Sequence, residues 1–311
     1  MMRLDKVSKV YRIGAFGGKK LPAVCDVSFD IRDTEVVSLI GESGSGKTTI
    51  GRMILRLIPI TSGKIWFNDV DISTLKGAAL KEYYRKVQGV FQDPYGSYNP
   101  IFKADRIFHI IRREFFPDIP QAEWDEKVER ALTSVGLNPR QVLNKFPHQL
   151  SGGQVQRFLI ARALLLDIEF LVADEIISML DASTRIDVLN LLADLKARGL
   201  SILFITHDLS LGYYISDRSV ILYRGYVVEK GSTEKIYSHP LHPYTKMLMA
   251  SVPRLDRKWE EVDVELKAKQ VELSGGCVYY ERCPKADARC HRQRPTLVEV
   301  EDGHSVACFH V

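Results

Sequence analysis

The stretch that decides the fold is GESGSGKT, residues 41–48, which matches the pattern G-x-x-x-x-G-K-[ST] at every fixed position. The apolar run EVVSLI precedes it over residues 35–40, and helical spacing follows over residues 49–57. We therefore expect a strand, a glycine-rich loop and a helix in that order. In such a loop the backbone N–H groups turn toward phosphate oxygens, and the positive end of the helix adds to the attraction. The stretch predicts a nucleotide site on an α/β fold.

The polar residues of this loop suit different parts of a magnesium nucleotide. Lys47 places a point charge at the terminal phosphates, and Thr48 offers its hydroxyl to Mg²⁺. We predict that the phosphate-binding residues are Gly41, Ser43, Gly44, Ser45, Gly46, Lys47, Thr48 and Thr49.

Three further apolar runs end in polar side chains. They are VQGVFQD (residues 87–93), FLVADE (170–175) and SILFITHD (201–208). The carboxyl ends of parallel strands meet at one edge of a sheet, so we expect these ends to lie together.

The chemistry of these strand ends is that of nucleotide hydrolysis. We predict that Asp174 holds Mg²⁺ together with Thr48 and Gln92, and that Glu175 is the general base for the attacking water. His207 suits a contact to the terminal phosphate.

The stretch LSGGQ, residues 150–154, opens a run with helical spacing. A Ser-Gly-Gly start leaves a helix N-terminus bare enough to meet phosphate. Taken alone it would predict only a capped helix. Its position between the loop and the strand end at Asp174 makes Ser151, Gly152, Gly153 and Gln154 nucleotide-binding candidates.

Composition excludes several classes of protein. The chain has 311 residues, 45% of them hydrophobic and 26% charged, which is enough material for a large α/β domain with an appendage. No apolar run is long enough to span a bilayer. The net charge of +4, from 43 basic and 39 acidic residues, leaves no electrostatic footprint for nucleic acid.

The ordered set of motifs resembles the ATP-binding subunit of an ABC transporter over about the first 250 residues. The resemblance implies a P-loop NTPase with a parallel-sheet core, an antiparallel β N-terminal part and a helical subdomain at about residues 95–165. We place the nucleotide-binding domain at residues 1–253. By this resemblance the Walker A loop is residues 41–48, the Q-loop residue is Gln92, the signature is residues 151–154, the Walker B pair is Asp174 and Glu175, the D-loop acid is Asp181, the switch histidine is His207, and the aromatic that stacks on adenine is Tyr11.

The same resemblance implies partners and a place in the cell. Two such domains form a head-to-tail sandwich, so we expect a second ABC ATPase subunit, as a heterodimer, with two transmembrane permease subunits and an extracytoplasmic solute-binding protein. The chain would lie at the cytoplasmic face of the membrane as a peripheral protein. A non-transport ABC ATPase and a metal-sensing regulatory nucleotide-binding protein are the alternatives.

Two other segments resemble the peptide and nickel importers within this family. They are FQDPYGSYNP (residues 91–100) and HPLHPYT (239–245), the latter followed by ASVP (250–253). The implied solutes are oligopeptides or dipeptides, with oligosaccharides or nickel as related possibilities. The proline-rich stretch around residues 92–100 is expected to be loop and to contact a permease.

One segment departs from the family pattern. Most members follow the second Walker B acid with Pro-Thr and then Ser-Ala-Leu-Asp, whereas this chain has IISMLD over residues 176–181. Because Glu175 is retained, we expect a competent site whose supporting backbone differs, since proline is absent and two β-branched residues follow.

Residues 254–311 form a second region, expected to begin as linker plus strand over residues 254–269. Four of the five cysteines, Cys277, Cys283, Cys290 and Cys308, fall in its last 35 residues. Clustered cysteines in a reducing compartment suggest a metal more than disulfides, and their spacing leaves the metal open. Similar tails in peptide-importer ATPases imply a [4Fe-4S] cluster of structural role, with zinc as the alternative.

Overall fold

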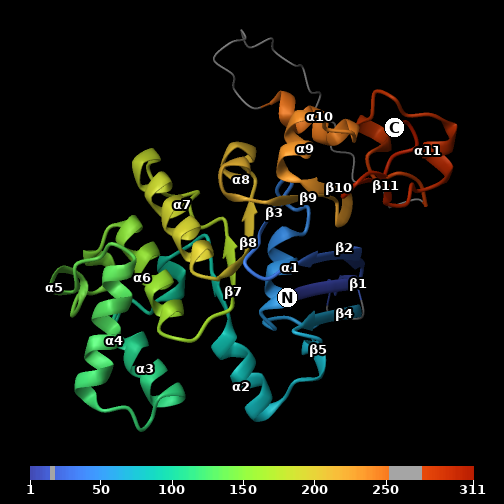
Figure 1. Cartoon of the computed structure of the whole chain (residues 1–311). Coiled ribbons are helices and arrows are strands. Elements are labelled where there is room, and N and C mark those ends of the chain that lie inside the picture. The colour runs from blue at the N-terminus through green and yellow to red at the C-terminus, as the bar shows by residue number, and fades with distance from the viewer. Residues whose placement is uncertain (15–17, 252–274) are drawn as a thin grey trace.

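The computed structural model describes residues 1–14, 18–251 and 275–311 (Figure 1). The strands in these residues are β1 (Met2–Arg12), β2 (Lys20–Ile31), β3 (Val36–Ile40), β4 (Ser62–Phe67), β5 (Val70–Asp71), β6 (Val87–Val90), β7 (Phe170–Asp174), β8 (Ser201–Thr206), β9 (Arg218–Tyr223), β10 (Tyr226–Ser232), β11 (Val298–Glu301) and β12 (His304–Val306). The α-helices are α1 (Lys47–Ile54), α2 (Gly77–Lys86), α3 (Arg106–Phe115), α4 (Gln121–Ser134), α5 (Pro139–Val142), α6 (Gly152–Leu164), α7 (Ala182–Ala197), α8 (Leu209–Ile215), α9 (Thr233–Ser238), α10 (Pro243–Ala250) and α11 (Ala288–Arg292).

A sheet of eight strands forms the centre of the molecule, in the order β11-β12-β10-β9-β3-β8-β7-β6. Neighbouring strands from β9 to β6 pair in parallel. Every residue of β3, β7 and β8 is buried, because helices cover both faces of a parallel sheet, and this explains their predominantly apolar sequences. The sheet brings the polar ends of β6, β7 and β8 to one edge, as the sequence predicted.

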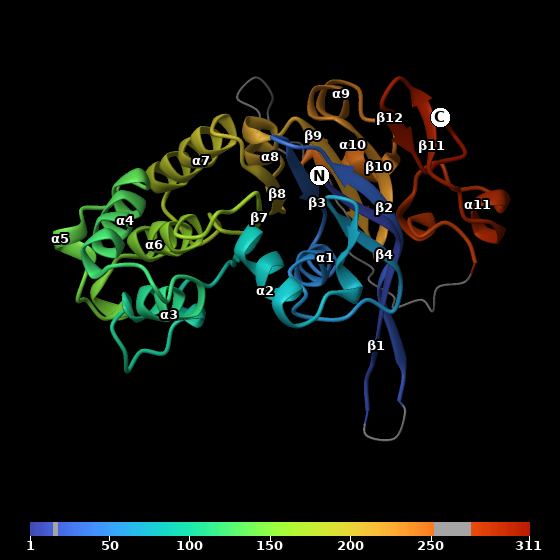
Figure 2. The ribbon, with the colours of Figure 1, turned by 60° about the horizontal axis from the view of Figure 1, so that its bottom comes forward.

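A second, antiparallel sheet of order β2-β1-β4-β5 packs beside the first. One apolar cluster joins Leu4 of β1, Ile65 of β4, Ile50 of α1 and Leu39 of β3. Helix α1 therefore lies between the two sheets, which fixes the loop that precedes it (Figure 2).

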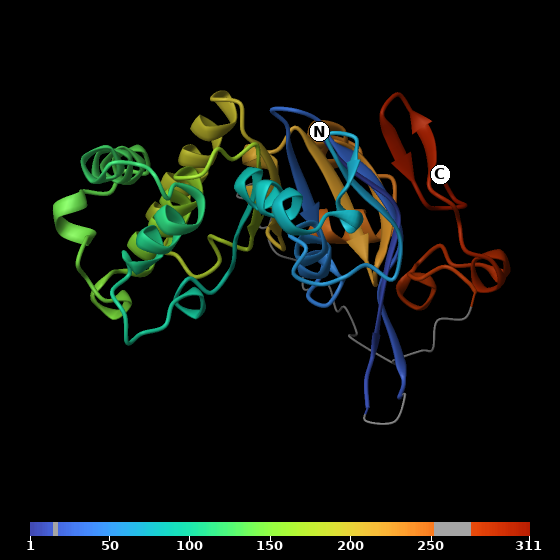
Figure 3. The same cartoon turned by 90° about the horizontal axis from the view of Figure 1, so that it is seen from below.

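Helices α3 to α6 form an arm on the opposite side of the central sheet from the chain's C-terminus (Figure 3). Its core is aromatic: the rings of Phe108 and Phe158 stack at 4.6 Å, and Trp124 is 1% exposed. Helix α4 buries Trp124, Val128, Ala131 and Leu132 in this arm.

The C-terminal extension, residues 275–311, is joined to the central sheet by its own hairpin. Strand β12 pairs antiparallel with β10, aligning Val306 with Glu229, and β11 adds the outermost strand. The predicted boundary between residues 253 and 254, and the strand expected over 254–269, lie outside the described residues.

The predicted fold class is confirmed by the two sheets and the helical arm, while the domain limits stay predictions. Within the described ranges, no helix combines the length and apolarity required to cross a membrane.

Candidate functional site

The loop of residues 41–48 is held in place by close backbone contacts that only glycine permits. A Cβ at Gly46, whose φ is +106°, would lie 2.4 Å from the carbonyl oxygen of Ala23 in β2. A Cβ at Gly41 would lie 2.1 Å from the carbonyl oxygen of Leu222 in β9. The loop therefore packs closely against β2 of one sheet and β9 of the other, and its backbone is available to a ligand.

Lys47 lies across the loop. Its Nζ donates hydrogen bonds to the carbonyl oxygens of Gly41, at 2.7 Å, and Glu42, at 3.0 Å. Burial lowers the pKa of Lys47, and three nearby carboxylates oppose that shift. The hydroxyl of Ser45 is buried without a hydrogen-bond partner among the described residues. A buried, unsatisfied hydroxyl fits a site that a polar ligand completes.

The loop opens onto a cavity of about 550 Å³. The cavity is lined by Ala23, Ser43, Gly44, Gly46, Lys47, Thr48, Thr49, Gln92, Glu175 and His207. The structure thus brings the ends of β6, β7 and β8 to the glycine-rich loop.

Two oxygen ligands for a hard cation meet at Thr48, which lines this cavity, and Asp174, which is hydrogen-bonded to it. Thr48 Oγ1 donates to Asp174 Oδ1 at 3.1 Å. Burial raises the pKa of Asp174, and the hydrogen bond from Thr48 acts the other way. Hydroxyl and carboxylate oxygens, with the amide of Gln92 in the same cavity, are the donor types that Mg²⁺ prefers, so the residues present fit this ion.

Glu175 and His207 lie side by side in the lining of the cavity, with His207 Nδ1 3.3 Å from Glu175 Oε1. The backbone of Glu175 has φ +50°, an uncommon conformation for a residue with a side chain. Its N–H donates to the carbonyl oxygen of Ile205 at 2.9 Å, and its own carbonyl accepts from Ser178. Surrounding bonds therefore hold this turn, as is usual for strained residues at functional sites.

The atypical segment after Glu175 is mostly core. Ile176 and Ile177 are 1% and 2% exposed and join the same apolar cluster as Leu180 and Phe158. Met179, by contrast, is 64% exposed. The two isoleucines therefore support the Glu175 turn by packing, without a proline to fix the backbone.

The LSGGQ residues lie at the start of α6. Ser151 caps this helix: its Oγ accepts from the N–H of Gln154 at 3.2 Å, and the Gln154 side chain accepts from the N–H of Ser151 at 2.9 Å. Gly153 packs against Thr184, whose N–H donates to Asp181 at the start of α7. None of residues 151–154 lines the cavity of Lys47.

Tyr11 lies near the end of β1, where it pairs with Leu21, and Lys9 Nζ sits 5.2 Å from the centre of its ring. It is not among the residues lining the cavity. Its role in stacking on adenine stays a prediction.

The cysteines of the extension are free thiols. Burial raises the pKa of Cys277, Cys283 and Cys290. The charges of Cys283 and Cys308 act on the pKa of Cys277 in the same direction.

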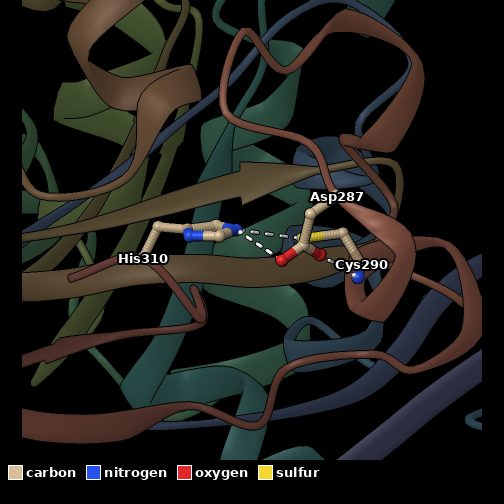
Figure 4. Close-up of side chains that lie close together, drawn as sticks. All are labelled: Asp287, Cys290 and His310. Atoms are coloured by element: carbon tan, nitrogen blue, oxygen red, sulfur yellow. Dashed lines mark hydrogen bonds and ion pairs between the residues drawn. The ribbon is translucent and has the colours of Figure 1, made fainter.

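The described residues whose potential ligand atoms converge within 4.8 Å are Asp287, Cys290 and His310, however, and not the four cysteines (Figure 4). His310 Nε2 lies 3.6 Å from the Cys290 sulfur and 3.4 Å from Asp287 Oδ2. Sequence reasoning overlooked Asp287 and His310; the spacing of Cys308 and His310, two residues apart, was the available signal.

Two family models match the chain. One, described as ABC transporter, covers residues 24–178, and the other, described as oligopeptide/dipeptide transporter, C-terminal region, covers residues 228–290. A relative in Brucella ovis is 43% identical over 91% of this chain and 90% of its own length. The chain is a member of the ABC transporter ATPase family. The predicted family is confirmed, and this ABC ATPase is an ATP-hydrolysing transporter subunit.

The relatives carry consistent names. The Brucella ovis protein is named a putative peptide import ATP-binding protein. A Haemophilus influenzae protein, 39% identical over 94% of this ABC ATPase and 89% of its own length, is named oligopeptide transport ATP-binding protein. Among solved structures, a dimeric ATP-binding cassette bound to ADP and Pi in a post-hydrolysis state superposes with a TM-score of 0.67. It is 28% identical to this chain, and the alignment covers 75% of this chain and 99% of the other.

Proposed function

We propose that this ABC ATPase powers the uptake of oligopeptides or dipeptides. The observation that carries the proposal is the match of residues 228–290 to the C-terminal region of oligopeptide/dipeptide transporters. The alignments to the two relatives named for peptide import cover 91% and 94% of this chain. Oligosaccharides and nickel are the alternative solutes. The nucleotide cavity does not choose between them and peptides, because it binds ATP and not the transported solute.

We assign a step in hydrolysis to each of the predicted site residues. The loop of residues 41–48 binds the phosphates, and Thr48, Asp174 and Gln92 would hold Mg²⁺, which neutralises phosphate charge when bound. Glu175 accepts the proton of the attacking water. His207, beside Glu175, orients that carboxylate and contacts the terminal phosphate.

The site is completed by a second ABC ATPase subunit. Residues 151–154 of this chain lie outside its own cavity, which supports a head-to-tail sandwich in which they meet ATP bound to the partner. We expect the partner to be a different ATPase chain. Co-expression of the two chains, size-exclusion chromatography with ATP and identification of the chains in the dimer peak distinguish this heterodimer from a homodimer.

The permease contact lies beside Gln92. The segment that follows it exposes large apolar side chains: Tyr95 is 42% exposed, Ile101 75% and Phe102 41%. An exposed apolar patch next to a site residue suits a surface that senses a membrane partner. The two permease subunits would hold the chain at the cytoplasmic membrane face, as a peripheral protein.

The transport proposal is tested with the chain, the second ATPase, the permeases and the solute-binding protein reconstituted in vesicles. We expect ATP-dependent accumulation of a labelled oligopeptide, and no accumulation when Lys47→Ala replaces the wild type. Accumulation of a sugar or of Ni²⁺ without any of peptide would overturn the proposed solute.

We also propose that Cys277, Cys283, Cys290 and Cys308 hold a metal centre, a [4Fe-4S] cluster. The presence of four cysteines within the last 35 residues supports it. The convergence of Asp287, Cys290 and His310 favours zinc, which accepts mixed oxygen, sulfur and nitrogen ligands. Metal analysis after anaerobic purification distinguishes the [4Fe-4S] cluster from zinc. Iron with acid-labile sulfide, lost in Cys283→Ser but kept in His310→Ala, supports the cluster, and stoichiometric zinc lost in His310→Ala contradicts it.

A further inference from the structure

The C-terminal extension contacts the phosphate-binding loop directly. Arg282 Nη1 lies 3.0 Å from Glu42 Oε1 and 2.9 Å from Glu42 Oε2. Glu42 is the second residue of GESGSGKT, and 240 positions separate it from Arg282. The side chains are 38% and 18% exposed respectively, so solvent only partly screens this pair.

The backbone of Glu42 makes a second contact, with Tyr244 of α10. The N–H of Glu42 donates to the hydroxyl of Tyr244 at 2.9 Å. The Tyr244 ring is fully buried and lies 4.5 Å from that of Tyr223 and 5.5 Å from that of Tyr279 in the extension. The Arg282 guanidinium lies about as close to this cluster, 5.8 Å from the Tyr279 ring centre. The first half of the loop therefore rests on α10 and on the extension.

The backbone and the side chain of Glu42 face opposite ways. Its carbonyl oxygen accepts from Lys47 Nζ, in the loop interior, while its carboxylate points to Arg282 and does not line the nucleotide cavity. A carboxylate released from Arg282 would be a free negative charge within a loop that binds triphosphate, and like charges repel.

We propose that Arg282 is a positioning residue for ATP binding. By pairing with Glu42 it fixes the first half of the phosphate-binding loop and keeps the Glu42 carboxylate turned away from the cavity. The cysteine-rich extension is then part of the nucleotide site, whichever solute the transporter carries.

The test uses the co-expressed complex and compares wild type with Arg282→Gln, Arg282→Lys and Arg282→Gln combined with Glu42→Gln. For Arg282→Gln we expect the KM for ATP and the Kd of a non-hydrolysed ATP analogue to rise about three- to tenfold, with kcat within about twofold of wild type. Arg282→Lys should raise both less, because it keeps the charge. Adding Glu42→Gln should return the KM and the Kd toward the wild-type values, because it removes the carboxylate that has lost its arginine partner.

The matched control is Arg292→Gln, an exposed arginine of the same extension that bonds only within its own helix among the described residues. It should leave the KM unchanged. A merely structural role for Arg282 would lower kcat through a smaller folded fraction without moving the KM. An unchanged KM in Arg282→Gln, or equal losses in Arg282→Gln and Arg282→Lys, would overturn the proposal. Should Arg282→Gln not fold, a KM of Arg282→Lys equal to that of wild type would overturn it as well.

Discussion

The nucleotide cavity and the C-terminal extension are both built from short segments that meet at the central sheet, but they differ in what holds them. In the cavity, three of the functional residues lie just beyond strand ends: Gln92 comes after β6, Glu175 after β7 and His207 after β8. The extension is held by pairs of residues from distant parts of the chain, Glu229 with His304 and Glu42 with Arg282.

The contrast teaches where sequence motifs are informative. In a parallel sheet, residues that follow successive strands meet at one edge, so their positions in the sequence predict their place in the structure. No local pattern links residues that are 75 or 240 positions apart. The extension therefore looks like an appendage in the sequence, although in the structure it adds two strands to the catalytic sheet.

The largest effect on stability is expected at the buried pair that anchors the extension. His304 Nε2 lies 2.8 Å from Glu229 Oε1, and both side chains are fully buried. Removing one partner leaves the other buried and underpaired, so His304→Ala should lower the free energy of unfolding by about 3 to 5 kcal/mol. Denaturant titration followed by circular dichroism measures this.

His291→Ala is the matched control, because His291 is an exposed histidine of the same extension. It should unfold as the wild type does. If His304→Ala loosened only the extension, leaving the main transition in place, the extension would be an appendage after all and the comparison would fail.

A smaller and pH-dependent effect is expected at His242, which caps α10 behind the loop. Its Nδ1 accepts from the N–H of Tyr244 at 3.0 Å, and burial lowers the pKa of His242 to about 4. The unfolded chain, with a histidine pKa of about 6.5, binds this proton more readily between pH 6.5 and 4. The folded state should therefore lose up to about 3 kcal/mol as the pH falls through that window.

His242→Asn checks this prediction, because asparagine also caps helices but does not titrate. The difference in unfolding free energy between the two proteins should shift in favour of the variant as the pH drops from 7 to 4. A difference that stays constant with pH would mean that His242 is not buried as described.

Much of the nucleotide-binding machinery could be predicted from the sequence because its chemistry is carried by fixed spacing. The loop around Lys47, the strand end at Asp174 and the capped start of α6 at Ser151 all lie where their patterns indicate. The left-handed backbone of Glu175 could not be predicted, because bonds to Ile205 and Ser178 impose it. Nor could the inward packing of Ile176, which depends on the helical arm.

In the extension the cysteines indicated a metal, but spacing alone specified neither the ligands nor the ion. Asp287 caps the helix that contains Cys290 and is only three residues from it, but His310 approaches both only once the chain has folded back on itself. The contact between Arg282 and Glu42 likewise joins the two ends of the chain. Both features are tertiary, and no propensity or periodicity reports them.

The central claim is that this chain carries a working ATP site despite its altered segment after Glu175. The most direct test is steady-state ATP hydrolysis by the complex co-expressed with its partner subunits, comparing wild type, Lys47→Ala and Glu175→Gln. We expect both variants to lose turnover, and Glu175→Gln to retain bound ATP while its kcat falls by about 10² to 10⁴. An active complex whose rate is unchanged by either variant would contradict the claim and place hydrolysis in the partner ATPase alone.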